Sequence, residues 1–312
     1  MSWPLAAAVA AAGLAAATPA LAQAPAAPAA EATAPPGTLA KLRRSGIILL
    51  GHRQAAVPFS YLVDGQPRGY AVDLCLRVVE GLRTRQNLPS LRVQWVPLQT
   101  ADRLPAVREG RVDLECGNTT ATAERRKTVS FTTPVFIAGA GVLARADARA
   151  STLQELRGKR IAVASGTTGE KIVNRANEML YGITPVIVKD NAEAFAAVEQ
   201  GRAEAWITDD ILLAAFRAQA AKPTDFVLLD KRHTIEPLAL MVRKDDAAFE
   251  RAVDAEMSEL LRSGEIQLLY MRWFTQPIPP RNVNLELPPS RLLREIFRTP
   301  LKMQHEVDVI VL

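Results

Sequence analysis

The chain has 312 residues, of which 48% are hydrophobic and 5% aromatic, and its net charge is +5. This length and apolar content predict about two domains with buried cores. Because the basic residues are scattered and aromatic residues are few, the composition does not favour nucleic-acid binding, and we expect no nucleic-acid partner.

The N-terminal segment has features of a cleaved secretion signal. An apolar, Ala-rich run ends in Ala20-Leu21-Ala22, a small-x-small pattern typical of cleavage sites. No Lys or Arg precedes the run, which a start further upstream would explain. Pro19 and the high Ala content make the run a poor membrane anchor. We therefore predict a signal peptide over residues 1–22, a disordered Ala/Pro linker over 23–37, and an exported, soluble protein.

Strands and helices alternate in the next part of the chain. Apolar runs and helical spacing of apolar residues predict strands at residues 46–53, 91–98 and 111–116, and helices at residues 70–85 and 103–110. The last of these strands would end at Cys116. This strand–helix–strand order is typical of an α/β sheet.

A second block repeats this order. It contains predicted strands at residues 159–166, 184–190, 203–210 and 225–230, and predicted helices at residues 167–180, 192–201 and 211–221. A strand over 236–246, a helical region over 247–274 that is broken near Gly264, and a Pro-rich irregular stretch over 275–290 follow. A short helix and an apolar tail without a predicted place end the chain.

The two cysteines predict a disulfide, because an even number in an exported chain is typical of one. Cys75 lies early in the predicted helix and Cys116 at the end of a predicted strand, so they can pair if that helix packs over that strand. The alternative is two buried thiols. The three His residues show no metal-ligand spacing, and we expect no metal.

Polar and charged side chains follow the predicted strands, at the edge where open α/β sheets bind ligands. The set comprises Arg53, Ser60, Thr100, Arg103, Asn118, Thr119, Thr120, Arg125, Thr167, Thr168, Asn191 and Asp209. Taken singly, an Arg is usually a solvated strand end, and a Thr or Asp before a helix is usually an N-cap. Together, the arginines, the hydroxyls and a helix N-terminus favour anions, and Asp209 supplies the one opposite charge. A ligand with two carboxylates and one ammonium matches this set.

The sequence carries no recognised catalytic motif. It has no Gly-x-Ser-x-Gly, no phosphate-binding Gly-Lys-Ser/Thr and no clear general base. These observations favour a binding protein, with no catalytic residue and no cofactor.

Several stretches resemble the family 3 extracellular solute-binding proteins, especially the glutamate/aspartate-binding proteins of ABC importers. They are GHRQAAVPFSY, GYAVDLC, the run from LQTADR to TTPVF, VASGTTGE, ITDDILLA and GEIQLLYMRWFTQPIPPRNVNLE. The resemblance covers residues 39–299 and implies an α/β, type II periplasmic-binding-protein fold, with two lobes that close on a ligand. Lobe 1 would comprise residues 38–142 and 239–299, and lobe 2 residues 143–238. AGVLAR and LALMVRK would be the hinge strands, and residues 300–312 a tail.

The resemblance also implies roles for the polar residues. Arg125, helped by Thr120, would pair with the α-carboxylate of an amino acid. Thr167 and Thr168 would add the dipole of their helix to the same group. Asp209 would bind the α-ammonium.

The carboxylate of the ligand's side chain would be bound by Arg53, Ser60, Thr100 and Arg103. The sequence departs from the family's pattern at Asn118, where Ser is usual, and at Asn191, where His is frequent. Losing that His removes one donor near the side-chain carboxylate, although Asn can still donate. Because two buried arginines facing an uncharged side chain would be unpaired, an acidic amino acid is the favoured ligand.

The resemblance thus predicts a monomeric, periplasmic binding component of an ABC amino-acid importer, whose partner is a permease in the inner membrane. Three alternatives remain open. The ligand could be Gln, Asn or another dicarboxylate. The chain could be a dehydratase-like enzyme on the same fold, or the sensory ectodomain of a receptor.

Overall fold

Two larger mixed sheets organise the part of the chain that the computed structural model describes, residues 37–229, 232–299 and 310–311. All of these residues belong to one unit, Pro36–Leu312. The first sheet has the strand order β17-β14-β6-β1-β5, with β7 and β8 also paired to β14. Its strands are β1 (Ile47–His52), β5 (Arg92–Pro97), β6 (Leu114–Thr120), β7 (Val129–Phe131), β8 (Phe136–Ala138), β14 (Thr234–Arg243) and β17 (Ile310–Val311). β1 is parallel to β5 and β6, whereas β14 is antiparallel to its partners.

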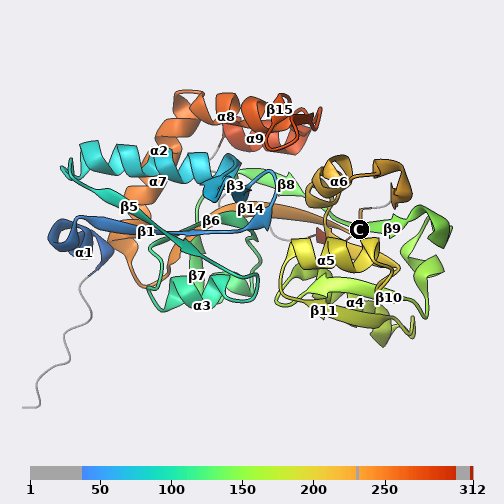
Figure 1. The fold of residues 1–312 in the computed structure, drawn as a ribbon. Coiled ribbons are helices and arrows are strands. Elements are labelled where there is room, and N and C mark those ends of the chain that lie inside the picture. The colour runs from blue at the N-terminus through green and yellow to red at the C-terminus, as the bar shows by residue number, and fades with distance from the viewer. Residues whose placement is uncertain (1–36, 230–231, 300–309, 312) are drawn as a thin grey trace, which may run out of the picture. The chain divides into compact units, whose positions relative to one another are not determined.

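Helices cover both faces of this sheet (Figure 1). They are α1 (Thr38–Ser45), α2 (Tyr70–Arg85), α3 (Arg103–Arg108), α7 (Ala247–Arg262), α8 (Glu265–Phe274) and α9 (Arg291–Arg298). α2 packs on β6, α7 and α8, because its buried residues recur at helical spacing, as in Leu74, Val78 and Leu82. Two small sheets complete this part, β2 (Ala55–Ala56) with β3 (Ser60–Val63) and β4 (Gln66–Arg68), and β15 (Pro277–Ile278) with β16 (Val283–Asn284).

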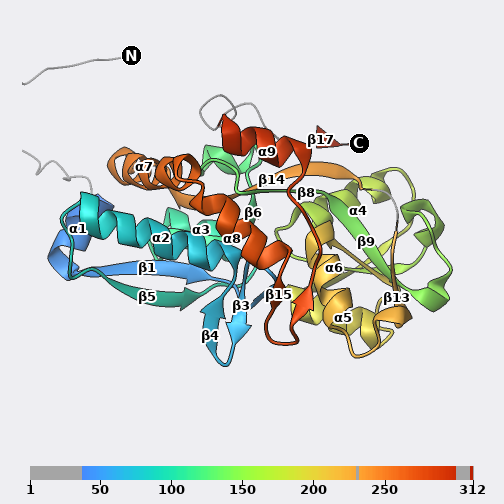
Figure 2. The same cartoon turned by 90° about the horizontal axis from the view of Figure 1, so that it is seen from above.

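The second sheet has the order β11-β10-β12-β9-β13. Its strands are β9 (Ala140–Arg145), β10 (Arg160–Ala164), β11 (Thr184–Val188), β12 (Ala205–Asp209) and β13 (Phe226–Leu228). Its helices, seen in Figure 2, are α4 (Thr168–Glu178) and α5 (Asn191–Glu199), which pack on β10 and β12, and α6 (Asp210–Gln219), which packs on β9, β12 and β13. Single turns of 3₁₀ helix lie at η1 (Arg125–Lys127), η2 (Ala146–Ala148), η3 (Leu153–Leu156) and η4 (Pro223–Asp225). The two sheets confirm the predicted α/β class.

The two connections between the sheets run side by side. One lies between β8 and β9, and the other precedes β14. The backbone N–H of Ala140 donates to Thr234 Oγ1 at 2.8 Å, and the N–H of His233 donates to the carbonyl of Ala140 at 2.8 Å. The segments expected to form a hinge, residues 140–145 and 238–244, correspond to β9 and to most of β14.

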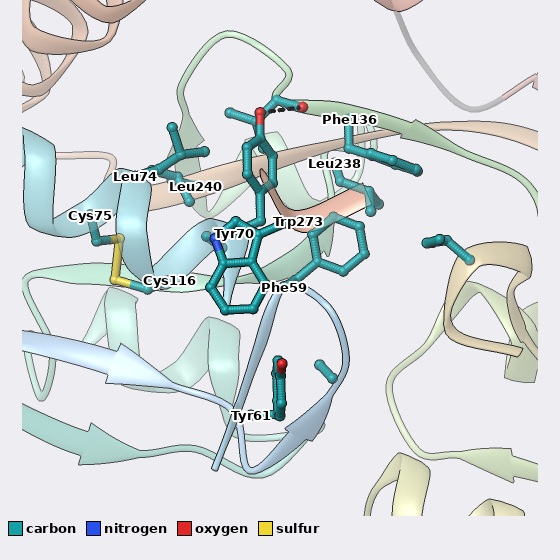
Figure 3. Close-up of a cluster of buried hydrophobic side chains, with 14 of the residues drawn as sticks. Phe59, Tyr61, Tyr70, Leu74, Cys75, Cys116, Phe136, Leu238, Leu240 and Trp273 are labelled. Atoms are coloured by element: carbon teal, nitrogen blue, oxygen red, sulfur yellow. Dashed lines mark hydrogen bonds between the residues drawn. A yellow bond between two sulfur atoms is a disulfide. The ribbon is translucent and has the colours of Figure 1, made fainter. Parts of the chain in front are cut away.

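The predicted disulfide is confirmed. It joins Cys75 of α2 to Cys116 of β6, and both residues are fully buried where the helix packs over the strand (Figure 3). Beside it lies an aromatic cluster in which Phe59 and Phe136 meet edge to face, with ring centroids 5.1 Å apart. The Tyr70 hydroxyl donates to the carbonyl of Val135 at 3.1 Å, which satisfies the one polar atom of that buried ring.

One predicted boundary is wrong. β6 does not end at Cys116 but runs from Leu114 to Thr120, because Thr119 and Thr120 continue the ladder by pairing with Ala239 and Leu238 of β14. The polar residues Asn118–Thr120 therefore lie in the strand rather than after it. Such an extension depends on a strand more than a hundred residues away.

The terminal predictions fall largely outside the described residues. The signal peptide over 1–22 and almost all of the linker over 23–37 lie there, as does most of the tail over 300–312. Ile310 and Val311 form β17, which pairs antiparallel with Ile235 and Thr234 of β14. No helix in the described ranges is both long and apolar enough to cross a membrane.

Candidate functional site

A cavity lies where β1, β5 and β6 of the first sheet meet the N-termini of α4 and α5 and the end of β12 from the second. The space between these elements measures about 290 Å³, which includes a part that is open to solvent. Its walls are formed by Arg53, Thr100, Arg103, Asn118, Thr120, Arg125, Thr167, Thr168, Asn191, Thr208 and Asp209. The predicted set of polar residues lines this cavity except for Ser60 and Thr119. Ser60 is buried behind Arg53, whose backbone N–H donates to Ser60 Oγ at 2.9 Å.

Helix α4 reaches the cavity because its N-terminus packs closely against β12. A Cβ atom at Gly169 would lie 2.7 Å from the carbonyl oxygen of Ile207, so a larger residue would push the helix away from the strand. Thr167 is the N-cap of α4, and its hydroxyl is bonded to backbone atoms on both sides. That hydroxyl is therefore used for capping, which leaves Thr168 as the hydroxyl of this helix that can act elsewhere.

Arg53 and Arg103 form a buried cationic pair, with exposed fractions of only 2% and 3%. Arg53 Nε donates to the carbonyl of Leu98 at 3.2 Å, and its Nη2 donates to Thr100 Oγ1. Arg103 Nε donates to the carbonyl of Thr100 at 2.8 Å, and its Nη1 donates to Thr119 Oγ1 at 2.8 Å. These bonds fix both guanidiniums and leave further N–H groups of each for a ligand.

Arg125 connects the two sides of the cavity. It follows β6 in η1 and is 7% exposed. Its Nη1 donates to the carbonyl of Thr120 at 2.9 Å, and its Nη2 donates to the carbonyl of Gly166, just before α4, also at 2.9 Å. The planar group is thus held at the N-terminus of α4, where backbone N–H groups also favour an anion.

Two hydrogen bonds donated by Asn side-chain amides also join the two sides of the cavity. Asn118 Nδ2 donates to Asp209 Oδ2 at 2.9 Å, and Asn191 Nδ2 donates to the carbonyl of Ala55 at 2.9 Å. The first bond joins β6 on the side of the first sheet to β12 of the second sheet, and the other joins β2 to α5 in the same way. Both Asn residues therefore have partners of their own in this arrangement, and their contact with a ligand stays a prediction.

Asp209 is the one acid among the described residues that line the cavity, but two more buried acids lie next to that lining. Glu115 and Glu236 are both 0% exposed. Glu115 Oε2 accepts a hydrogen bond from Thr119 Oγ1 at 3.2 Å, and its Oε1 is buried without a hydrogen-bond partner among the described residues. Each acid stands in a strand, β6 or β14, that is otherwise mostly apolar or small, and this contrast is the sequence signal that could have identified them.

Burial and neighbouring charge perturb the pKa values of these groups. Burial lowers the pKa of Arg53 to about 9, and the guanidinium of Arg103 contributes to this lowering. Burial raises the pKa of Asp209, and the carboxylate of Glu236 raises it further. Burial also raises the pKa of Glu115 against the opposing effect of Arg103 and Arg53. Arg53 and Arg103 therefore repel each other, as do Asp209 and Glu236, whereas Glu115 interacts favourably with both of these arginines.

The side chains of this lining can bind a charged or polar ligand. Its described side chains are those of Arg, Thr, Asn and Asp, which offer charge and hydrogen bonds but no Ser–His or Cys–His pair. In the described ranges, no group of three or more His, Cys, Asp or Glu could hold a metal ion.

Sequence comparison matches the chain to one family profile and to several similar proteins. The profile of the bacterial extracellular solute-binding proteins, family 3, matches residues 48–276. The L-glutamate/L-aspartate-binding protein of Pseudomonas aeruginosa is 40% identical over 267 residues, covering 85% of this chain and 88% of that protein. The glutamate/aspartate import solute-binding protein of Escherichia coli is 36% identical over 266 residues, covering 84% and 88%.

Solved structures show the same fold. The P235GK mutant of the arginine-binding protein from T. maritima matches with a TM-score of 0.67 and 27% identity, covering 75% of this chain and 98% of that one. AncCDT-1, an ancestral amino-acid-binding protein and precursor of cyclohexadienyl dehydratase, matches with a TM-score of 0.65 and 28% identity, covering 77% and 100%. The predicted type II periplasmic-binding-protein fold is confirmed.

Proposed function

Because the chain belongs to the bacterial extracellular solute-binding proteins of family 3, we propose that it binds glutamate and aspartate for an ABC importer. The proposal places it in the periplasm, as a monomer that delivers its ligand to a permease in the inner membrane. The relatives from P. aeruginosa and E. coli are named for these two amino acids, which supports the choice of ligand.

One observation carries the proposal: the cavity combines buried guanidiniums with a buried carboxylate, Asp209. Arg125 would bind the α-carboxylate, and Asp209 the α-ammonium. Arg53, Arg103 and Thr100 in the cavity wall, with Ser60 behind Arg53, would bind the side-chain carboxylate. Charge-assisted hydrogen bonds in a cavity shielded from water supply the affinity.

The ligand would enter when the two sides separate. We propose two lobes, residues 38–142 with 239–299 and residues 143–238, which close on the ligand about the adjacent connections near Ala140 and Thr234. The bonds that cross the cavity, such as Arg125 to Gly166 and Asn118 to Asp209, belong to the closed arrangement. Closure would then report occupancy to the permease.

The number of buried charges near the cavity favours a second class of ligand, amino acids with an uncharged polar side chain. The buried acids Glu115, Glu236 and Asp209 equal in number the three buried arginines Arg53, Arg103 and Arg125. An amino acid with an uncharged polar side chain, Gln or Asn, would keep that balance, whereas glutamate adds one negative charge. An enzymatic role has no such support, because the one carboxylate among the described lining residues would be occupied by an ammonium.

Thermal shift followed by calorimetry tests the proposal. The purified protein would be screened against the amino acids, because a ligand that binds only the native state raises Tm. We expect glutamate and aspartate to raise Tm, and calorimetry to show one site for each. If glutamine or asparagine raised Tm and the acidic amino acids did not, the second ligand class would replace the first. If no amino acid did so, the proposal would be wrong.

A further inference from the structure

Glu236 is a buried carboxylate that accepts hydrogen bonds from three hydroxyl groups. It lies on β14 and is 0% exposed. Its Oε2 accepts hydrogen bonds from Thr120 Oγ1 at 2.8 Å and from Thr168 Oγ1 at 2.9 Å, and its Oε1 accepts one from Thr234 Oγ1 at 2.7 Å. A buried carboxylate needs such donors, and three hydroxyls supply them here.

These bonds fix the direction of two hydroxyls that line the cavity. A Thr hydroxyl has one hydrogen to donate, and a carboxylate can only accept. Thr120 and Thr168 have each given that hydrogen to Glu236, so only their lone pairs are left for another partner. Lone pairs attract an ammonium N–H and repel a carboxylate. The prediction that the Thr120 hydroxyl helps to bind the α-carboxylate therefore does not suit this arrangement.

The location of Glu236 makes this effect part of the ligand site. Thr120 comes from β6 and Thr168 from α4, so one carboxylate is bonded from both sides of the cavity. Its negative charge also acts on Asp209, the residue proposed to bind the ammonium. Asp209 and the hydroxyl oxygens of Thr120 and Thr168 are therefore hydrogen-bond acceptors in the cavity lining, which we call the accepting wall, and Glu236 is bonded to the two hydroxyls from outside the lining.

We propose that Glu236 is a positioning residue that makes this wall specific for an ammonium group, by orienting the hydroxyls of Thr120 and Thr168. This inference rests on the proposed function, since it concerns the amino end of the same ligand. Glu236 does so without lining the cavity itself. The ligand feature it selects is the α-amino group, as opposed to the side chain.

The test compares glutamate with glutarate, which is glutamate without its amino group. Calorimetry would give the Kd of each for the wild type, for Glu236→Gln and for a matched control, Glu250→Gln. Glu250 is also a Glu bonded by a hydroxyl, that of Ser130 at 2.9 Å, but away from the cavity. The amide introduced by Glu236→Gln would lack the charge, and it can donate to a Thr hydroxyl, which frees that hydroxyl to donate to a carboxylate.

We expect the ratio of glutarate Kd to glutamate Kd to fall about tenfold or more in Glu236→Gln, because hydrogen bonds to charged groups contribute at this level. The control should keep the wild-type ratio. A purely structural role would weaken both ligands alike and leave the ratio unchanged, and that result would overturn the inference.

A second pair of variants covers the case in which Glu236→Gln does not fold. Thr168→Val removes one oriented hydroxyl, and Thr168→Ser keeps it. The Val variant should lower the ratio and the Ser variant should restore it, whereas equal ratios in both would overturn the inference. If glutamate fails to bind the wild type, the proposed binding of glutamate is wrong. The comparison of glutamate with glutarate is then replaced by a comparison of the amino acid identified in the thermal screen with the same molecule lacking its amino group.

Discussion

Replacing Arg125 with Ala should abolish high-affinity binding of every amino acid. The guanidinium is 7% exposed, and it is held between the carbonyls of Thr120 and Gly166 at 2.9 Å on both sides. In the proposed complex it pairs with the α-carboxylate, which all amino acids share. Its removal would leave that carboxylate buried without its cation.

The magnitude follows from the burial of the pair. Removing one partner of a buried, hydrogen-bonded charge pair costs about 2–5 kcal/mol. Since about 1.4 kcal/mol corresponds to a factor of ten, Kd should rise by about 30- to 4,000-fold. Loss of the link from Arg125 to Gly166 adds to this cost, because that bond joins the two sides of the closed cavity.

Calorimetry with glutamate and glutamine measures the effect, and Lys127→Ala serves as the control. Lys127 is a cation two residues further on, with an exposed side chain, so its loss should change Kd by less than about twofold. A Kd for glutamate in Arg125→Ala within threefold of the wild-type value would refute the assignment of Arg125 to the α-carboxylate.

Three further predictions address the side chain, pH and stability. Arg103→Ala should weaken glutamate about tenfold more than glutamine, measured by calorimetry, because only glutamate carries a second carboxylate; equal losses would contradict its role. Affinity for glutamate should fall as pH decreases below about 7, because burial and Glu236 raise the pKa of Asp209 to about 7 and protonation removes the charge that binds the ammonium. A Kd that does not rise from pH 8 to pH 5.5 would argue against this role. The double variant Cys75→Ala/Cys116→Ala opens a bridge with a sequence separation of 41 and should lower the free energy of unfolding by about 4 kcal/mol. Denaturant titration measures that loss, and Kd should stay unchanged.

The local spacing of apolar residues was sufficient to predict most of the helices and strands. The helix predicted over residues 70–85 is α2, because its apolar residues recur every three or four positions over four turns. Most of the residues that line the cavity could also be predicted, since the ends of parallel strands meet at one edge of a sheet. Arg53 after β1 and Asp209 at the end of β12 are examples.

Features that depend on distant pairing could not be predicted. β6 extends to Thr120 only because β14 lies beside it, and Glu236 is satisfied by Thr120, which is 116 residues away. The sequence shows these acids and hydroxyls but not which of them meet. For this reason the predicted inventory of charges omitted Glu115 and Glu236, and the direction in which the Thr120 hydroxyl donates could not be foreseen.

The grouping of like charges explains why net charge alone does not select the ligand. Arg53 and Arg103 repel each other, a repulsion that the nearby Glu115 offsets only in part, and Glu236 repels Asp209. A ligand that brings a carboxylate to the arginines and an ammonium to the acids relieves both repulsions at once. A dianion without an ammonium group, such as glutarate, relieves only the repulsion between the arginines and adds to the repulsion between the acids. We therefore expect glutarate to bind more weakly than glutamate despite its greater negative charge, because the cavity discriminates by how charge is separated along the ligand.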